Sequence, residues 1–202
     1  MARPIEVLLF DLGGVLVDFS GVADLQALLP GPSTTTDVLA RWIGCPHSLA
    51  FGMGSMSTEQ FAERFIRDWG IALEPGAFLS AYRSWCRGLL PGARELLCEL
   101  RPRYRLAALS NSNEVHWAAL AEDPALVGLF DAMYSSHQLG VRKPDAAIYG
   151  AALERLAAPA ASVLFFDDAE ANVEAARRAG LEACRADGVE GVRRCLRGRG
   201  LL

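Results

Sequence analysis

The chain has 202 residues, of which 51% are hydrophobic and 22% are charged, and its formal net charge at pH 7 is −4. Because a domain usually holds ~100–200 residues, this length fits one domain that carries a sizeable insertion. The composition is that of an ordinary globular protein and excludes a disordered tail, a collagen and a coiled coil. The negative charge, with no basic run before the last ten residues, argues against nucleic-acid binding.

Cysteine usage and the apolar runs indicate where the protein works. The five cysteines are widely spaced and form no Cys-x-x-Cys pair, which favours reduced cytosolic thiols over a disulfide framework or a zinc site. The apolar run Val7–Phe10 is shorter than the ~7–15 residues of a signal-peptide core. The most apolar later stretch, Leu156–Phe166, is shorter than the ~18 residues of a membrane helix. We therefore expect a cytoplasmic protein with no membrane partner, and the oligomeric state stays open.

Five short apolar runs are typical of buried strands. The first, Ile5–Phe10, contains β-branched residues and ends in a turn at Asp11–Gly14. The other four, in chain order, are Arg105–Ser110, Ala132–Ser135, Ser162–Phe166 and Glu182–Arg185.

Helical patterns lie between the later runs. The predicted helices are Ala93–Leu100, Glu114–Ala121 behind a cap at Asn113, a helix with Pro144 in its first turn that runs to Leu156, and Ala169–Ala179, which stops at Gly180. Strands that alternate with helices of this length predict an α/β fold, namely a Rossmann-like, doubly wound parallel sheet covered on both faces.

Residues 16–90 follow a different pattern, with no convincing strand. Ser57–Gln60 matches a capping box and is followed by aromatic residues at helical spacing, and Ala77–Trp85 is a second plausible helix. We therefore predict that residues 1–15 and 91–202 form the core. Residues 16–90 would form an inserted helical cap above the carboxyl end of the first strand.

Polar residues follow several of the predicted strands. In an open α/β sheet, ligands bind beyond the carboxyl ends of the strands. Each residue alone is weak evidence, because a strand-end aspartate often only turns the chain or caps a helix. Their occurrence together favours a functional site. The candidates are Asp11, Ser110, Asn111, Lys143, Asp167 and Asp168.

Phosphoryl transfer is the chemistry that needs this set. Asp11, Asp167 and Asp168 would repel one another unless a cation neutralised them, and a hard divalent ion held by a few oxygens is typical of Mg²⁺. Asp11 can also act as the nucleophile, because carboxylates form covalent phosphoryl intermediates. Ser110 and N–H groups at a helix N-terminus would hold phosphate oxygens, and Lys143 would neutralise charge.

Lys143 is the only lysine of the chain, so the other 19 of the 20 basic residues are arginines. A compact ammonium group is favoured where a planar guanidinium does not fit. Chance retention of one lysine explains the same observation about equally well.

Four segments that contain these residues resemble, in order and spacing, the motifs of the haloacid dehalogenase-like (HAD) hydrolase superfamily. They are Phe10–Leu16, Leu109–Asn111, Arg142–Asp145 and Phe165–Asp168. The insertion after the first motif resembles the family's helical cap, so the resemblance covers essentially the whole chain. The branch that looks most similar contains the glucose-1-phosphate phosphatases and the N-terminal phosphatase domain of soluble epoxide hydrolases. The segments that resemble this branch are Phe51–Phe61 and Ser136–Pro144.

The resemblance implies a Mg²⁺-dependent phosphatase for a small phosphorylated metabolite, with sugar phosphates among the candidates. It implies that Asp11 attacks phosphorus. Asp11, Asp168 and the backbone carbonyl of Gly13 would ligate Mg²⁺, and Asp167 would act through water. The residues implied to bind the phosphoryl group are Ser110, Asn111 and Lys143.

Gly13 departs from the usual family phosphatase, which has a second aspartate there as general acid and then base. Such help is typically worth ~10²–10⁴ in rate. Three interpretations stay open. In the first, the leaving group needs little protonation, as in anomeric sugar phosphates or aryl phosphates. In the second, another residue or water takes the role of the aspartate, with His47, His116 and His137 as candidates. In the third, activity is weak or lost. The glucose-1-phosphate branch also has glycine here, which favours the first.

Two other functions compete with a phosphatase. A carbon–halogen hydrolase would use Asp11 without Mg²⁺, but family dehalogenases usually carry an aromatic residue in place of Gly13. A non-catalytic binding protein is the alternative of a different class. In either enzyme the cap would set specificity, and the candidate cap residues are Phe19, Arg41, Trp42, His47 and Phe51.

Overall fold

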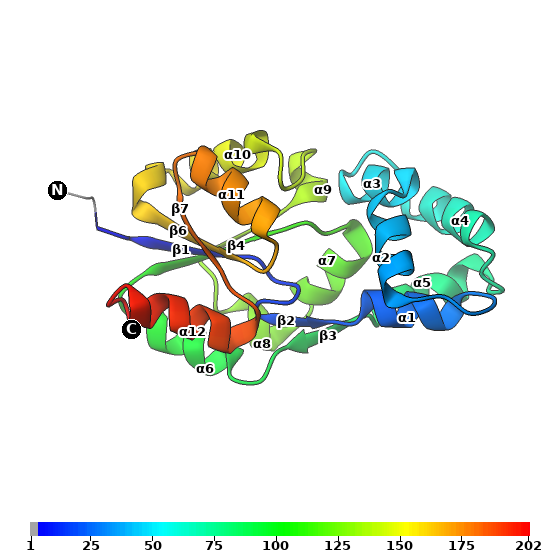
Figure 1. The fold of residues 1–202 in the computed structure, drawn as a ribbon, viewed down its shortest axis with the longest axis horizontal. Coiled ribbons are helices and arrows are strands. Elements are labelled where there is room, and N and C mark those ends of the chain that lie inside the picture. The colour runs from blue at the N-terminus through cyan, green and yellow to red at the C-terminus, as the bar shows by residue number, and fades with distance from the viewer. Residues whose placement is uncertain (1–3) are drawn as a thin grey trace.

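Five parallel strands form the central sheet of the computed structural model, which describes residues 4–202 except for the side chain of residue 125. The strand order is β5-β4-β1-β6-β7 (Figure 1). The strands are β1 (Val7–Phe10), β4 (Arg105–Ser110), β5 (Ala132–Ser135), β6 (Val163–Asp167) and β7 (Glu182–Arg185). The predicted doubly wound α/β fold is confirmed. The first three residues of the expected core lie outside the described residues.

Both faces of the sheet are covered, which explains why its strands are apolar without alternation. Leu8 and Phe10 of β1 pack into one hydrophobic cluster, and Val7 and Leu9 pack into a second cluster on the opposite face. The helices that contribute to the first cluster are α6 (Ala93–Leu100), α7 (Glu114–Ala121), α8 (Pro124–Val127) and α12 (Gly188–Gly198). Those on the second are α9 (Ser136–Leu139), α10 (Ala146–Leu156) and α11 (Glu170–Arg178), with a 3₁₀ turn at Ala160–Ser162.

Helix α10 begins later than predicted. Asp145 is its N-cap, and the Asp145 side chain accepts a hydrogen bond from the backbone N–H of Ala147 at 2.9 Å. Pro144 therefore precedes the helix instead of lying in its first turn, because an aspartate that satisfies a free N–H is a strong start signal. Gly180 follows α11 with a φ of 89°, as expected for a glycine just beyond a helix end.

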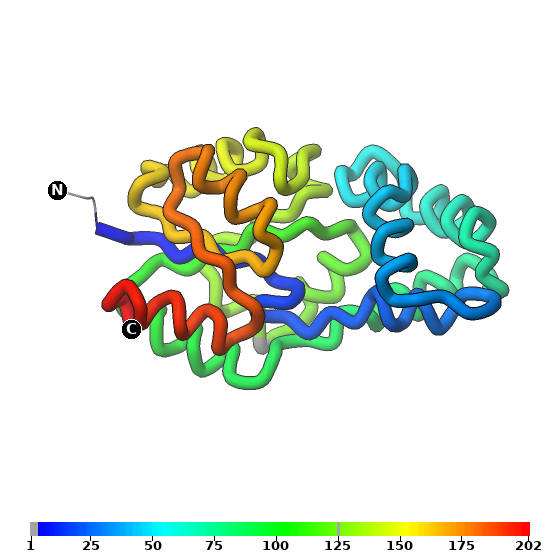
Figure 2. Tube along the Cα trace, in the orientation of Figure 1, coloured from blue at the N-terminus to red at the C-terminus, as the bar shows by residue number. Residues whose placement is uncertain are grey.

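The prediction that residues 16–90 contain no strand is wrong. Strands β2 (Val17–Phe19) and β3 (Cys86–Leu89) pair antiparallel and connect the core to the inserted helices (Figure 2). These strands are three and four residues long, and they pair although they lie at opposite ends of the insertion. No local pattern along the chain therefore predicts them. The inserted helices are α1 (Gly21–Leu28), α2 (Thr35–Ile43), α3 (Pro46–Gly52), α4 (Thr58–Trp69) and α5 (Pro75–Arg83).

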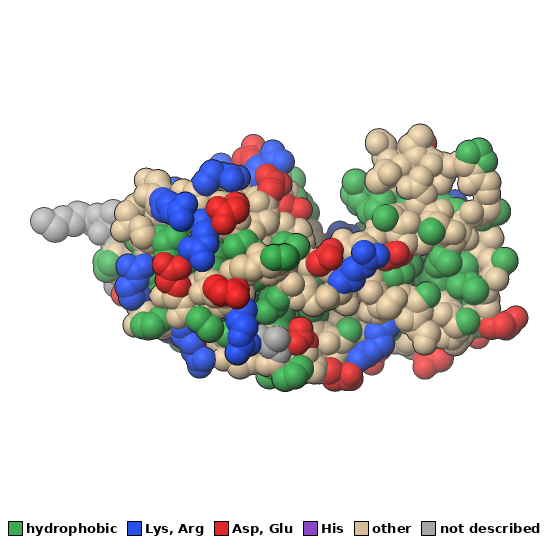
Figure 3. Space-filling view, turned by 90° about the horizontal axis from the view of Figure 1, so that it is seen from below, with side chains coloured by type: hydrophobic (Ala, Val, Ile, Leu, Met, Phe, Trp, Pro, Cys, Tyr) green, Lys and Arg blue, Asp and Glu red, His purple; other side chains and the backbone are tan. Residues whose placement is uncertain are grey.

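We call strands β2 and β3 with helices α1–α5 the cap, and it has its own apolar core. Helix α4 begins where the capping box places it, since Ser57 Oγ accepts a hydrogen bond from the N–H of Gln60 at 3.3 Å. Phe61 and Phe65 of α4 are fully buried in this core. Helix α5 begins and ends two residues earlier than predicted. On the face in Figure 3, charged side chains gather mainly over the sheet and its helices, at the left.

Close backbone contacts seat the cap on the core. Ser136 Oγ of α9 donates a hydrogen bond to the carbonyl of Gly52 at 2.6 Å. Gly54 has a φ of 69°, and a Cβ there would lie 2.3 Å from the carbonyl oxygen of His137. Only glycine allows this approach. Both contacts are made to α9, which directly follows the carboxyl end of β5, so the cap lies beyond the carboxyl ends of the strands (Figure 1).

Cys184 and Cys195 form a disulfide, which corrects the prediction that every cysteine is reduced. Cys184 lies in β7 and Cys195 lies in α12, which packs beside that strand, so their Cα atoms are 6.5 Å apart. Spacing along the chain does not show this proximity. Within residues 4–202, every helix is too short or too polar to cross a lipid bilayer.

Candidate active site

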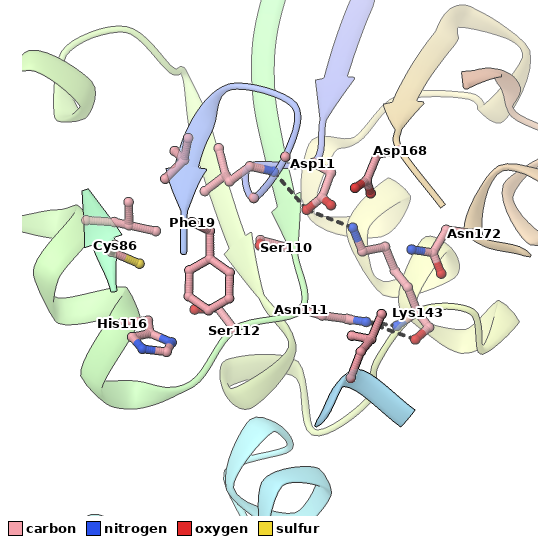
Figure 4. A pocket seen from close by; sticks show the side chains of 16 residues that line it. Asp11, Phe19, Cys86, Ser110, Asn111, Ser112, His116, Lys143, Asp168 and Asn172 are labelled. Atoms are coloured by element: carbon pink, nitrogen blue, oxygen red, sulfur yellow. Dashed lines mark hydrogen bonds and ion pairs between the residues drawn. The ribbon is translucent and has the colours of Figure 1, made fainter. Parts of the chain in front are cut away.

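Three neighbouring strands bring the candidate residues to one edge of the sheet. Asp11 directly follows β1, Ser110 ends β4, and Asp167 ends β6. Because β1 lies between β4 and β6, these side chains meet at the carboxyl ends (Figure 4). The N–H of Asp11 donates to the carbonyl of Phe166 at 2.8 Å, so the ladder between β1 and β6 holds the Asp11 backbone in place.

Lys143 enters this group from a loop and is 1% exposed. Its Nζ lies 2.9 Å from Asp11 Oδ1 and 2.7 Å from Asp167 Oδ2. Burial by itself lowers the pKa of Lys143, but the two carboxylates outweigh burial and raise the pKa above its usual value. The ammonium group is therefore charged and fixed in place.

Asn111 holds the backbone of Lys143. Asn111 Oδ1 accepts the N–H of Lys143, and Asn111 Nδ2 donates to the carbonyl of Lys143, both at 2.9 Å. The family resemblance implies that Asn111 binds the phosphoryl group, and this stays a prediction. Because both ends of its side-chain amide bind the lysine backbone, Asn111 also positions Lys143.

Asp167 is completely buried and uses both carboxylate oxygens within the protein. Oδ1 accepts hydrogen bonds from the N–H of Ala169 and from Nδ2 of Asn172, each at 2.9 Å, and Oδ2 faces Lys143. Asn172, in the first turn of α11, was not predicted. A polar residue one turn after a strand-end aspartate is the only local signal that marks it.

Asp168 approaches the loop that follows Asp11. Gly14 has a φ of 75°, and a Cβ at Gly14 would lie 2.7 Å from Asp168 Oδ2. A side chain at position 14 would therefore push Asp168 away in a backbone conformation that already favours glycine. Burial, and then repulsion from Asp167, raise the pKa of Asp168.

These carboxylates fit a divalent cation. Asp11, Asp167 and Asp168 each offer an oxygen, and these atoms lie within 4.8 Å of one another. With Lys143 as their cationic partner, the cluster has two more negative than positive charges when all four groups are ionised. Burial is the main cause that raises the pKa of Asp11 to about 6, with Lys143 opposing it and Asp167 adding to it. Clustered hard oxygens with surplus negative charge are the donor set that Mg²⁺ prefers.

A cavity of about 420 Å³ opens in front of these groups. It is lined by Asp11, Ser110, Lys143 and Asp168, and Figure 4 shows them around one space. Within the described part of the chain the hydroxyl of Ser110 has no hydrogen-bond partner, so it is available to a ligand. Gly13 also lines the cavity and presents no side chain to it.

The three histidines lie in different places. His47 pairs with Asp68 on the cap at 2.8 Å, and His137 Nδ1 lies 2.5 Å from Ser135 Oγ. Only His116 lines the cavity, among the described residues. Both ring nitrogens of His116 are engaged, Nε2 with the carbonyl of Tyr82 at 2.8 Å and Nδ1 with Asn113 Nδ2 at 3.0 Å. His116 is therefore a neutral wall residue that lacks a free nitrogen for acid catalysis.

Of the predicted cap residues, Phe19 and Trp42 lie at the cavities and the others pack elsewhere. Trp42 lines a second cavity of about 290 Å³ that adjoins the first. Arg41 stacks over the ring of Trp69 at 4.0 Å. Phe51 is buried in the cap core, stacked on an aromatic ring of α4 at 4.3 Å.

His116 makes folding stability depend on pH. Burial lowers the pKa of His116 to about 4. Between about pH 6.5 and pH 4 the unfolded chain binds a proton at this position that the folded protein does not, so the free energy of unfolding falls as the pH decreases. We expect wild type to lose up to roughly 3 kcal/mol across this window relative to His116→Gln. Urea unfolding at several pH values in EDTA measures the difference, and parallel curves for the two proteins would contradict it.

Comparison with known proteins assigns the family. The model for haloacid dehalogenase-like hydrolases matches residues 5–180. The chain is also 31% identical to Phosphatase MT3486 of Mycobacterium tuberculosis, over 91% of this chain and 88% of that protein. The chain belongs to the haloacid dehalogenase-like hydrolase family. It is a hydrolase, and the family resemblance of its four motifs is confirmed.

A second relative and a solved structure also match most of the chain. Pyrimidine 5'-nucleotidase YjjG of Escherichia coli is 27% identical over 87% of this chain and 83% of that protein. A HAD family enzyme of Bacteroides thetaiotaomicron, crystallised with magnesium and inorganic phosphate, superposes with a TM-score of 0.75 at 22% identity, over 90% of this chain and 94% of that one. The shared architecture therefore leaves the substrate to be argued from this chain's own residues.

Proposed function

We propose that this HAD hydrolase is a Mg²⁺-dependent phosphatase that hydrolyses a small phosphate monoester through an aspartyl-phosphate on Asp11. The observation that carries the proposal is the convergence of three carboxylates and the buried Lys143 on one cavity. Phosphatases among the relatives and the magnesium and phosphate in a structural neighbour support it. We infer that residues 16–90 act as the cap that covers the substrate.

The bonds of the Asp11 carboxylate support its proposed role as nucleophile. Its Oδ1 is held by the N–H of Leu12 at 2.7 Å and by Lys143, which leaves Oδ2 to face the cavity without a bond from the described residues. We propose that Mg²⁺ is held by Asp11, Asp168 and the carbonyl of Gly13. When bound, the ion neutralises the carboxylates and polarises the phosphoryl group.

Lys143 and Ser110 would stabilise the charge of the transferring group. Asp11 and Asp167 fix the ammonium before substrate arrives, so little reorganisation is needed during the reaction. Ser110 offers its free hydroxyl to a phosphate oxygen. Asp167, bound by Ala169 and Asn172, keeps Lys143 in position from inside the protein.

Metal dependence tests this proposal. With p-nitrophenyl phosphate, we expect phosphate release in Mg²⁺, loss to the level of the Asp11→Asn variant in EDTA, and recovery when Mg²⁺ is restored. Release that never exceeds the Asp11→Asn level would instead favour a binding protein without catalysis.

Chloroacetate in EDTA tests the alternative enzyme class in parallel. A carbon–halogen hydrolase would release chloride there, since it needs no cation. We expect no chloride above the Asp11→Asn level, because without a metal ion the three carboxylates outnumber Lys143 and repel the chloroacetate anion.

A further inference from the structure

The cavity in front of Asp11 continues into the cap. The cavity of about 420 Å³ and the adjoining one of about 290 Å³ share Phe19, Leu39 and His116 in their walls. Figure 4 shows Phe19 and His116 facing the space across from Asp11 and Lys143. The part of a substrate attached to the phosphoryl group therefore meets these walls.

Exposed apolar side chains gather at this place. The large hydrophobic residues exposed in the described part of the chain are Phe19 (38%), Leu39 (42%), Ile43 (59%) and Val127 (49%). Three of these four line one or both cavities, whereas Val127 lines neither. Apolar surface left in water is unfavourable, so its concentration beside polar catalytic groups indicates a binding surface for an apolar moiety.

The wall of the second cavity holds one charged residue and four aromatic rings, those of Phe19, Trp42, Tyr82 and His116. Phe19 lies edge-on to the ring of His116 at 5.2 Å and tilted to Trp42 at 6.1 Å. His116 is neutral because burial disfavours its charged form, and its Nδ1 must be unprotonated to accept the amide N–H of Asn113. Arg142 is the charged residue of the second cavity, and the described residues offer its guanidinium no ion pair. A guanidinium is attracted to the face of an aromatic ring, which favours an aryl over an alkyl occupant.

Gly13 favours the same occupant for a chemical reason. With no acid side chain at this position, the leaving oxygen departs unprotonated. A phenol, whose pKa is near 10 in tyrosine, gives up its oxygen as an anion far more readily than an alcohol with a pKa like that of water, near 15.7. In the first step an Asp11 oxygen bonds to phosphorus while the bond from phosphorus to the aryl oxygen breaks. The electron pair leaves on that oxygen, which takes a proton from water. In the second step water bonds to phosphorus and the Asp11 carboxylate is released with inorganic phosphate.

We propose that the substrate is a phosphate monoester of an aryl alcohol, and that Phe19, Leu39 and Trp42 form the wall against which its ring packs. This inference rests on the proposed phosphatase activity and specifies its substrate class. Leu39, on the exposed side of α2, is a specificity-determining residue of that wall.

A substrate panel with Mg²⁺ tests it. Phenyl phosphate carries an aryl group, hexyl phosphate an apolar alkyl group, and glucose 1-phosphate a polar group with an anomeric leaving oxygen. We expect kcat/KM for phenyl phosphate to exceed that for either other ester by at least ~10²-fold, the scale of missing acid catalysis. If glucose 1-phosphate or hexyl phosphate is hydrolysed equally well, the aryl inference is overturned and the phosphatase stands. If none is hydrolysed although p-nitrophenyl phosphate is, the aryl inference is overturned, and if p-nitrophenyl phosphate is not hydrolysed either, the phosphatase itself fails.

Two variants locate the effect. Leu39→Gln should lower kcat/KM for phenyl phosphate about 10-fold, within the range for a changed hydrophobic pocket, and leave that for glucose 1-phosphate within about 2-fold. Val127→Gln, at a similarly exposed apolar site away from the cavities, should change neither. Equal losses on both esters, or no loss with Leu39→Gln, would overturn the assigned wall.

Gly13→Asp tests the leaving-group argument separately. A Cβ at Gly13 would have Phe19 Cβ as its nearest neighbour at 3.7 Å, an ordinary contact, so the backbone there admits a side chain. It should raise kcat for hexyl phosphate by ~10²-fold or more and that for phenyl phosphate much less. Equal gains on both would contradict the role given to Gly13.

Discussion

Replacing Asp11 with asparagine is expected to lower phosphate release from p-nitrophenyl phosphate to the uncatalysed level. An amide is a poor nucleophile and a poor metal ligand, so the variant loses both functions of the carboxylate. The loss is measured as the steady-state rate of phosphate release at an enzyme concentration of at least about 1 μM. Rapid acid quenching then tests for phosphate bound to the protein, which wild type should form and the variant should not.

Protein stability separates loss of chemistry from loss of fold. The pKa of Asp11 is raised from 3.8 to about 6, so between these pH values the folded protein binds a proton that the unfolded chain does not. The free energy of unfolding therefore falls as the pH rises from 3.8 to about 6, and it stays lower above that pH. Without metal, Asp11→Asn should therefore be as stable as wild type at pH 7, or more stable by on the order of 1–3 kcal/mol. Activity near the wild-type level would remove Asp11 from its role, whatever the stability.

Replacing Lys143 with alanine should reduce kcat about 10²–10³-fold, the ~2.7–4 kcal/mol that follows removal of one preorganised donor. The structure adds a second consequence, because the variant leaves Asp11 and Asp167 facing one another without their cation. Breaking a buried pair in this way costs about 3–5 kcal/mol of stability. Both effects are measured on the same protein, by kinetics and by urea unfolding.

Lys143→Arg is the matched control for charge. It keeps a cation, but the 1% exposure of Lys143 and its two ion pairs, at 2.7 and 2.9 Å, fit a compact ammonium and not a planar guanidinium. We expect Arg to restore little of the activity, which would give a chemical reason for the single lysine. An unchanged kcat/KM in Lys143→Ala would count against the phosphate site.

Local patterns predict most of the core because each core element satisfies its own requirements along the chain. Strand β1 is apolar throughout since both faces are covered, and Asn113 accepts the N–H of His116 at 3.1 Å as an N-cap must. Burial on two faces and capping leave a mark within a few residues. The same local patterns predict where the strands end, and therefore the edge of the sheet at which the carboxylates gather.

Contacts between distant segments are what the patterns did not predict. Strands β2 and β3 pair from opposite ends of the insertion, and the Cys184–Cys195 disulfide joins a strand to a packed helix. Asn111 turned toward the backbone of Lys143 because the loop around Lys143 lies beside it. Such pairings depend on where segments meet in space, and residue type alone does not encode them.

The amino-acid sequence by itself determined the doubly wound sheet and the set of polar residues at its carboxyl edge, because strand burial and helix caps are local. Only the tertiary structure decided how those residues divide their work. It joined the Asn111 amide to the backbone of Lys143 and gave Asp167 its partner Asn172. It also brought Phe19 of strand β2 into the wall of the cavity that Asp11 lines. Side-chain roles depend on which neighbour is nearest in space, and folding alone sets that distance.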